Sequence, residues 1–265
     1  MTFRTLPLGN ILAKSILLPL FHFKLLLTLC APYIAFSFVA PLFIDDLVSQ
    51  SYSANMMLYI AISVVLLLLA AVNCHKVFLL SDQQRDSLSP FSLNKSHVKF
   101  AYAALVFAIM SGLLSVPFIM ISGAALGDGH ARAMHEPLEQ GNYLFYIMML
   151  PVAYFSSRWA MILPDAAVGE KRGSGWAWAL TQHHALSVFF LIGIVPVGLA
   201  LLTKFMLSFI VSPTLTHLVG SALGLVFSVI ELCILSLTYA WLVEADRDKA
   251  GKDIADTQQA TDTDL

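Results

Sequence analysis

Residues 158–181 read RWAMILPDAAVGEKRGSGWAWALT, and the rest of the chain is arranged around them. The stretch leaves a hydrophobic segment at Arg158 and is interrupted by Pro164. Four charged residues and a glycine follow: Asp165, Glu170, Lys171, Arg172 and Gly173. Two tryptophans then lead into another long apolar segment. A charged turn between two such segments predicts a connection between two membrane-spanning helices.

The composition indicates a membrane protein. Of the 265 residues, 58% are hydrophobic and only 12% are charged, whereas soluble domains average about 25% charged residues. Because so few charges cannot form a water-soluble surface, we expect lipid to cover much of the protein. The net charge is −2 and the basic residues are scattered, so no nucleic-acid partner is expected.

Six apolar stretches are each long enough to cross a bilayer, which takes about 20 residues. They cover approximately residues 25–44, 55–74, 100–124, 142–163, 185–207 and 218–243. Two polar segments between them, 75–99 and 125–141, are predicted as loops. The charged and Thr/Asp/Gln-rich residues 244–265 predict a disordered cytoplasmic tail. We therefore expect an all-α polytopic protein with one membrane domain over residues 1–243.

A short amphipathic segment precedes the first apolar stretch. Its apolar residues recur at helical spacing: Leu8, Ile11, Leu12, Ile16 and Leu20. Such a helix can lie in the plane of the lipid headgroups, with Lys14 reaching for a phosphate. The alternative is a simple lead-in to the first span. In either case Pro19 is expected to end or bend the helix.

The distribution of Lys and Arg predicts the orientation in the membrane. With six spans, two basic residues fall on one side, Arg132 and Lys204, and the other 13 of the 15 fall on the opposite side. Cytoplasmic loops carry an excess of Lys and Arg. We therefore predict a multi-pass protein of the bacterial cytoplasmic (inner) membrane, with both termini in the cytoplasm.

Two ionisable residues are predicted to lie within spans. Glu231 falls near the middle of the sixth span, where a charge is costly and usually faces a bundle interior or a water-filled cavity. It is interpreted either as a proton- or cation-coupled site or as a protonated side chain bonded to a nearby serine or carbonyl. Arg158 lies inside the end of the fourth span. It is interpreted as snorkelling to the headgroups or, alternatively, as pairing with Glu231.

The turn after the fourth span has both a structural and a ligand-binding interpretation. Asp165 follows Pro164 and is predicted to cap a helix that begins near Ala166. Lys171 and Arg172 would each gain about 1 kcal/mol from anionic lipid at the membrane surface, although the bias of basic residues towards the cytoplasm explains them without a ligand.

No catalytic constellation is visible in the sequence, so an enzyme is not expected. The histidines of the segment 125–141 lack the i, i+4 spacing that places two imidazoles on one helix face. The three cysteines lie in or at the ends of apolar stretches, and none forms a CxxC pair: Cys30, Cys74 and Cys233. Neither a metal site nor a cofactor nor a disulfide framework is therefore expected.

The segment from Arg158 through Pro164 to Glu170 and Gly173 resembles a motif of known membrane proteins. It is similar to the membrane domain fused to some bacterial glycerophosphodiester phosphodiesterases and to stand-alone YciC-like inner-membrane proteins. The resemblance covers most of residues 5–243 and implies a six-helix inner-membrane protein. It does not imply phosphodiesterase activity, because residues 1–265 include no segment for a catalytic barrel.

Two functions from different classes follow from these observations. The first is a non-enzymatic membrane protein that handles lipids or regulates envelope processes, with membrane lipids and a further membrane protein as partners. The second is a small proton-coupled transporter or carrier that uses Glu231. The sequence names neither a substrate nor an oligomeric state.

Overall fold

The computed structural model describes residues 5–39, 54–126 and 143–263, and each of its elements is helical. In chain order these are α1 (Leu8–Phe21), α2 (Phe23–Val39), α4 (Ala54–Leu79), α5 (Asp82–Arg85), α6 (Lys95–Leu126), α8 (Tyr143–Trp159), α9 (Ile162–Ala167), α10 (Ser174–Thr181), α11 (Ala185–Val188), α12 (Val195–Leu207) and α13 (Pro213–Thr263). A 3₁₀ turn (Gln182–His184) and a π-helical stretch (Phe189–Ile194) join α10 to α12. The predicted all-α class is confirmed.

Four helical stretches are long and apolar enough to cross a membrane, and they indicate a multi-pass membrane protein. They cover Met56–Leu79, Lys95–Ile121, Ser174–Leu207 and Thr214–Lys249. A fifth crossing results if α1 and α2 are counted as one broken span. The fourth predicted span corresponds to α8, which has only 17 residues.

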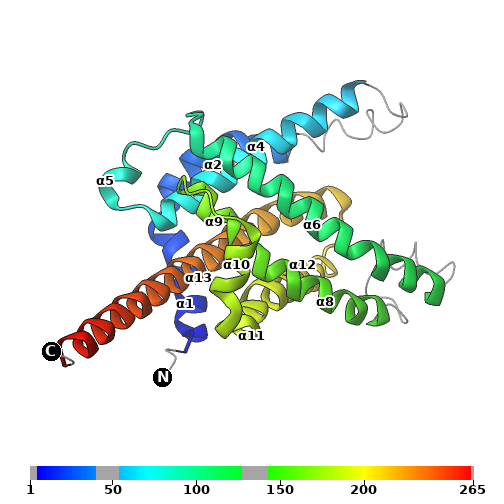
Figure 1. The fold of residues 1–265 in the computed structure, drawn as a ribbon. Helices are drawn as coiled ribbons and strands as arrows, with labels where there is room; N and C mark the ends of the chain where they lie inside the picture. The colour runs from blue at the N-terminus through cyan, green and yellow to red at the C-terminus, as the bar shows by residue number, and fades with distance from the viewer. Residues whose placement is uncertain (1–4, 40–53, 127–142, 264–265) are drawn as a thin grey trace.

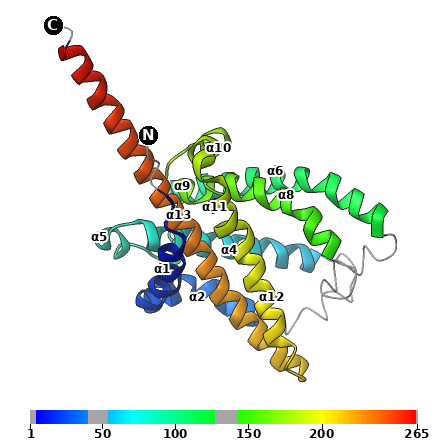
Figure 2. The same cartoon turned by 90° about the horizontal axis from the view of Figure 1, so that it is seen from below.

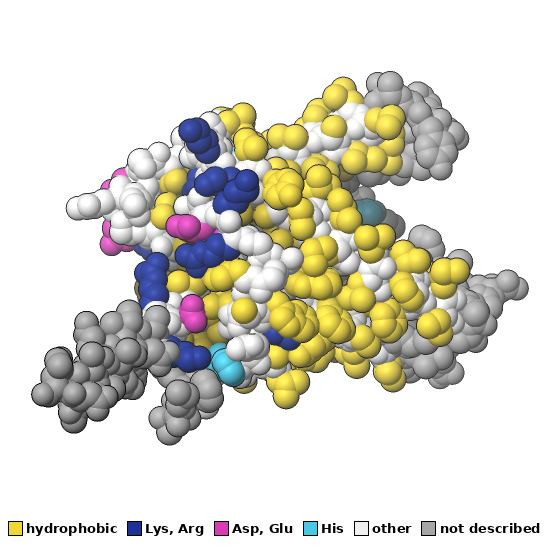
Figure 3. All heavy atoms as spheres, in the orientation of Figure 1, with side chains coloured by type: hydrophobic (Ala, Val, Ile, Leu, Met, Phe, Trp, Pro, Cys, Tyr) yellow, Lys and Arg dark blue, Asp and Glu magenta, His cyan; other side chains and the backbone are white. Residues whose placement is uncertain are grey.

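The bundle is packed tightly at one end and spreads at the other (Figures 1 and 2). What we call the basic end is formed by α1, the start of α2, the C-terminal part of α4, α5, the start of α6, the C-terminal end of α8, α9, α10 and the part of α13 that packs against them. The opposite ends of α4, α6 and α8 diverge, whereas α12 and α13 run side by side. Figure 3 shows Lys and Arg gathered towards the basic end, with hydrophobic side chains over most of the remaining visible face.

The basic end also contains the buried polar residues of the described part of the chain. They are Ser15, Asn73, His75, Lys76, His97, Ser157, Arg158, Asp165, Thr181, Ser236 and Thr238. By contrast, large apolar side chains near the other end of α4 and α6 are exposed, including Met57 and Met120. Lipid is expected to surround these outer segments, so the polar interior is confined to one end of the molecule.

Two predicted boundaries differ from the structure. The predicted loop over residues 75–99 begins too early, because α4 continues to Leu79 and residues 72–78 are all buried. His75 and Lys76 therefore belong to a buried helix end. The tail predicted as disordered from Glu244 is instead the continuation of α13 to Thr263. This segment is rich in Lys, Asp, Ala and Gln and contains no proline, and Gly251 is its only glycine. A helix can therefore propagate through it.

The three cysteines converge in one buried cluster, formed where α2, α4 and α13 meet. The Sγ atoms of Cys30 and Cys74 are 3.5 Å apart. Cys233 belongs to the same hydrophobic cluster and is fully buried. The thiols are free in the structure, so α2 and α4 are held together here by packing of small side chains rather than by a covalent bond.

This proximity predicts a selective cross-link. A membrane-permeant oxidant such as iodine should join Cys30 to Cys74, because their sulfurs need to approach only from 3.5 Å to the disulfide distance of about 2.05 Å. Counting thiols with a maleimide-polymer reagent after denaturation should then give one reactive cysteine instead of three. In the Cys233→Ala variant, the number of reactive thiols should fall from two to none. Three reactive thiols after oxidation would contradict the α2–α4 packing.

Candidate functional site

The turn that follows the fourth apolar segment is fixed by the side chain of Asp165. This residue lies inside α9 with only 1% of its surface exposed. Its Oδ1 accepts a hydrogen bond from the hydroxyl of Tyr239 on α13 at 3.0 Å, and its Oδ2 accepts one from the backbone N–H of Arg172 at 3.0 Å. The prediction that Asp165 caps a helix beginning near Ala166 is therefore wrong. Its carboxylate instead joins α9 to the following turn and to α13.

Three features of the backbone complete this turn. Gly169 has a φ of 93°, a left-handed conformation that glycine adopts without steric cost. The ammonium group of Lys99, on α6, donates a hydrogen bond to the carbonyl of Gly169. The carbonyl of Asp165 accepts from the N–H of Glu170 at 3.0 Å. The connection is thus tied to α6 and α13 as well as to α9.

The charged residues of the motif differ in exposure. Glu170 and Lys171 are exposed, and Gly173 precedes the first residue of α10. The guanidinium of Arg172 lies 4.6 Å from the ring centre of Trp176, and its Nε lies 3.7 Å from Asp165 Oδ1. Pro164, in contrast, is buried within α9. The motif therefore has a buried structural half and a solvent-facing charged half.

Burial raises the pKa of the Asp165 carboxyl above its ordinary value of 3.8, and the bonds from Arg172 and Tyr239 offset this only in part. A raised folded-state pKa means that the folded protein binds the proton more tightly than the unfolded chain. We therefore expect stability to increase as the pH falls through the raised pKa, and the gain to be complete below about pH 3.8.

Comparison with Asp165→Asn tests this expectation. Because asparagine does not titrate, the melting temperature of the wild type relative to this variant should rise between pH 7 and pH 4. The measurement is thermal unfolding in detergent over that range. Glu170→Gln, at an exposed neighbouring carboxyl, is the control. A constant difference between wild type and Asp165→Asn across the range would contradict the prediction.

Arg158 is turned into the protein instead of towards the headgroups. It is only 4% exposed. Its Nε donates to the hydroxyl of Thr181 at 2.9 Å, and an Nη donates to the carbonyl of Trp178 at 2.6 Å. The guanidinium carbon lies 3.3 Å from the ring centre of Trp178. The snorkelling interpretation is therefore wrong, and Arg158 instead holds α10 against the end of α8.

Glu231 lies on α13 and is partly buried. Within the described part of the chain it forms no hydrogen bond or ion pair, and Arg158 is engaged with α10. The predicted pair of Arg158 with Glu231 is thus not formed. Among the described residues, Glu231 also forms no hydrogen bond to a serine or a backbone carbonyl, as the other interpretation required.

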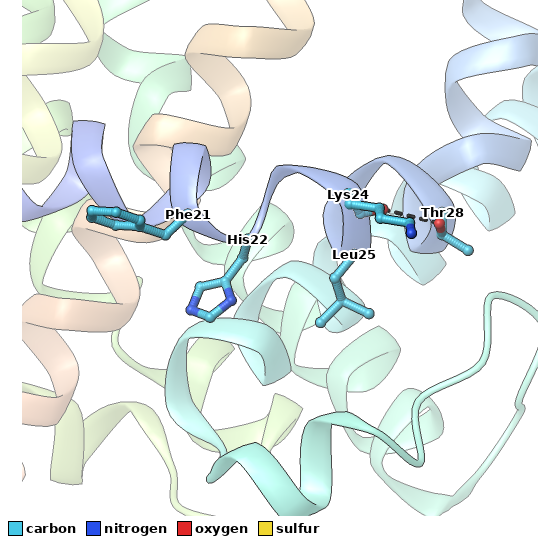
Figure 4. Close-up of a pocket in the computed structure, with 5 residues that line it drawn as sticks. All are labelled: Phe21, His22, Lys24, Leu25 and Thr28. Carbon is cyan, nitrogen blue, oxygen red and sulfur yellow. Dashed lines mark hydrogen bonds between the residues drawn. The ribbon is translucent and has the colours of Figure 1, made fainter.

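The structure adds a pocket that sequence reasoning missed, at the bend between α1 and α2 (Figure 4). The two helix axes differ in direction by 80°. The open pocket has a volume of about 340 Å³ and is lined by Phe21, His22, Lys24, Leu25 and Thr28. Arg85 of α5 reaches it, with Nη1 3.4 Å from His22 Nε2. Pro19 signalled the bend, but the approach of α5 was not visible in the sequence.

These groups are suited to binding an anion between apolar side chains. No group of three or more His, Cys, Asp or Glu residues within residues 5–39, 54–126 and 143–263 is placed to hold a metal ion. The pocket at the bend combines a lysine, a histidine and a nearby arginine with Phe21 and Leu25. Arginine and lysine donate charge-assisted hydrogen bonds to phosphate and carboxylate oxygens.

The chain matches no protein-family model, no curated protein and no solved structure.

Proposed function

We propose that this protein is a non-enzymatic, six-span protein of the bacterial cytoplasmic membrane that binds anionic phospholipids at its basic end. The six spans would be α2, α4, α6, α8, the stretch from α10 to α12, and α13. The 17 residues of α8 lie at the short limit of what crosses a bilayer. The proposal keeps the six-helix layout implied by the resemblance to YciC-like proteins.

The observation that carries this function is the direction of α1. Because α1 is turned 80° from α2, it would lie along the membrane surface if α2 crosses the bilayer. Ile11 on one side of α1 is buried in the core formed with α13. Ile16, Leu20 and Phe21 are 54%, 65% and 80% exposed. Exposed apolar residues beside Lys14 are typical of a helix in the headgroup region.

The basic residues at the same end supply the attraction for negatively charged lipid. Lys14 and Lys24 are on or next to α1, Lys95 is exposed at the start of α6, and Lys171 is exposed in the turn before α10. Each lysine or arginine near an anionic surface contributes about 1 kcal/mol of binding. Lys204 lies in the last turn of α12, away from this group. The charges and the exposed apolar helix thus favour the same end for lipid contact.

Native mass spectrometry of the detergent-purified protein tests the function. The protein should retain phosphatidylglycerol in preference to phosphatidylcholine of the same acyl chains. A variant with Lys14, Lys95 and Lys171 changed to glutamine should lose part of that preference, whereas Lys204→Gln should keep it. Equal retention of the two lipids by the wild-type protein would rule the proposed function out.

A proton-coupled carrier is the second candidate, and the position of Glu231 favours it. This carboxyl is on a spanning helix and lacks a partner among the described residues. The test is labelling of Glu231→Cys in a background without Cys30, Cys74 and Cys233. Modification by a small membrane-impermeant thiol reagent would support a polar pathway to this depth. Protection, with labelled loop controls, would count against a carrier.

A further inference from the structure

We propose that the pocket at the α1–α2 bend is the site that binds the phosphate of an anionic phospholipid headgroup. This inference rests on the proposed function and deepens it by naming the site. Three features of the pocket support it: its cationic groups, its apolar surroundings and its position at a helix bend.

The cationic groups come from two separate parts of the chain. Lys24 lies at the start of α2, and Arg85 approaches from α5, where its Nη1 faces Nε2 of His22. Lys24 and Thr28 are neighbours on one turn of α2, where the Thr28 hydroxyl donates to the Lys24 carbonyl at 2.9 Å. This bond uses the backbone of Lys24 and does not involve its ammonium group, which lies beside Thr28 in Figure 4. A phosphate there would contact Lys24 directly.

One carboxylate competes for this cationic cluster. Asp82 is 2.6 Å from Arg85 Nη1, and its side chain is 93% exposed. It therefore neutralises part of the positive charge of Arg85 without being buried itself. Lys24 supplies the charge that Asp82 does not pair with. The two residues should consequently influence anion binding in opposite directions.

The surroundings of the pocket favour a lipid over a free phosphate ion. Phe21 is 80% exposed and Phe23 is 60% exposed, on either side of His22. Leu25 forms part of the lining. Aromatic and aliphatic side chains of this kind suit the boundary between headgroups and acyl chains. A ligand with a phosphate and a hydrocarbon part satisfies both halves of the pocket.

The position of the pocket agrees with the depth of a headgroup. The bend of 80° lies where α1 ends and α2 begins. With α1 along the surface and α2 crossing the bilayer, the bend falls at the level of the lipid phosphates. A lipid already in the membrane would reach the site by lateral diffusion.

The decisive experiment compares single variants by native mass spectrometry with phosphatidylglycerol and phosphatidylcholine. Lys24→Gln should weaken retention of phosphatidylglycerol about fivefold, which corresponds to about 1 kcal/mol. Asp82→Asn should strengthen it, because the competing carboxylate is removed. Lys204→Gln should match the wild type. Thermal unfolding of each variant shows whether its fold is intact, and Asp82→Asn keeps the test valid if Lys24→Gln is unstable.

The outcomes separate this inference from the function on which it rests. Wild-type protein without a preference for phosphatidylglycerol would refute the proposed function. A normal wild-type preference that neither Lys24→Gln nor Asp82→Asn alters would leave the function standing and overturn the site. Displacement of bound phosphatidylglycerol by millimolar inorganic phosphate would show that the pocket takes the free ion, and would overturn its assignment to lipid.

Discussion

Replacing Arg158 with alanine is expected to destabilise the protein by about 3 kcal/mol. The side chain is buried and makes two hydrogen bonds to α10, at 2.9 Å to Thr181 and 2.6 Å to the Trp178 carbonyl. A hydrogen bond to a charged group is worth about 1.5–3 kcal/mol. The contact of the guanidinium with the ring of Trp178, at 3.3 Å, adds up to about 2 kcal/mol when it is shielded from water.

Arg158→Lys separates charge from shape. Lysine keeps the positive charge but has neither the planar fork nor the flat surface that stacks on Trp178. We therefore expect Arg158→Lys to be less stable than the wild type and more stable than Arg158→Ala. The measurement is the melting temperature in detergent, where 1 kcal/mol corresponds to roughly 2–4 °C for a chain of this size. Lys171→Ala, at an exposed position of the same turn, is the control and should change little.

A different result would change the interpretation of Arg158. If Arg158→Ala melted within about 1 °C of Lys171→Ala, the inward-facing bonds would contribute nothing to stability. The arginine would then have to be sought at the membrane surface, as the snorkelling interpretation required. If Arg158→Lys were as stable as the wild type, charge alone would account for the effect and the stacking on Trp178 would be incidental.

The class of the protein could be predicted from sequence because it depends on properties averaged over many residues. Membrane helices must be about 20 apolar residues long, and stretches of that length are visible without knowledge of any contact. A bend near Pro19 was also predictable, since proline removes a backbone hydrogen bond and kinks a helix, although α1 continues through Pro19 to Phe21. The sequence left open whether the amphipathic segment that contains Pro19 lies along the membrane surface or simply leads into the first span. The 80° bend between α1 and α2 favours the surface position.

The partners of the buried polar residues could not be predicted, because they lie far away in the chain. His75 Nδ1 is 2.7 Å from the hydroxyl of Ser236, a residue 161 positions later. Without this partner, a histidine next to Lys76 is typical of a loop, and the helix end was placed too early. Asp165 was likewise assigned a local capping role, although its carboxylate bonds to Tyr239 on α13. Local patterns describe near neighbours well and distant ones not at all.

The same limitation affected the residues in the predicted spans. Hydropathy indicated that Arg158 and Glu231 are ionisable residues within apolar spans, but it cannot indicate which groups they contact. Which of the two would find a partner depended on how α8, α10 and α13 are packed. Arg158 found Thr181 and Trp178 on the adjacent short helix, whereas Glu231 lies on α13 away from that contact. The pocket at the bend was missed for a related reason, since Arg85 reaches it from a separate element.

Asn73 should behave in the opposite way to Arg158. It is 1% exposed on α4, and neither its Nδ2 nor its Oδ1 has a hydrogen-bond partner among the described residues. A buried polar group that lacks its bonds costs about 1–3 kcal/mol. Leucine has the same branched arrangement of four side-chain heavy atoms and no polar atoms, although its two methyl groups occupy more space than the amide. We therefore expect Asn73→Leu to stabilise the protein by about 1–2 kcal/mol.

The control for this prediction is Asn10→Leu, which makes the same chemical change at an exposed position on α1. Surface substitutions of this kind usually stay within about 0.5 kcal/mol. The melting temperature of Asn73→Leu in detergent should rise above both the wild type and Asn10→Leu. A fall larger than the overpacking cost of about 1–3 kcal/mol would mean that the amide of Asn73 is satisfied in the membrane by a group outside the described residues. Asn73 would then be a polar contact that the protein maintains, as it maintains the bonds of Arg158, and the basic end would contain a second polar anchor on α4.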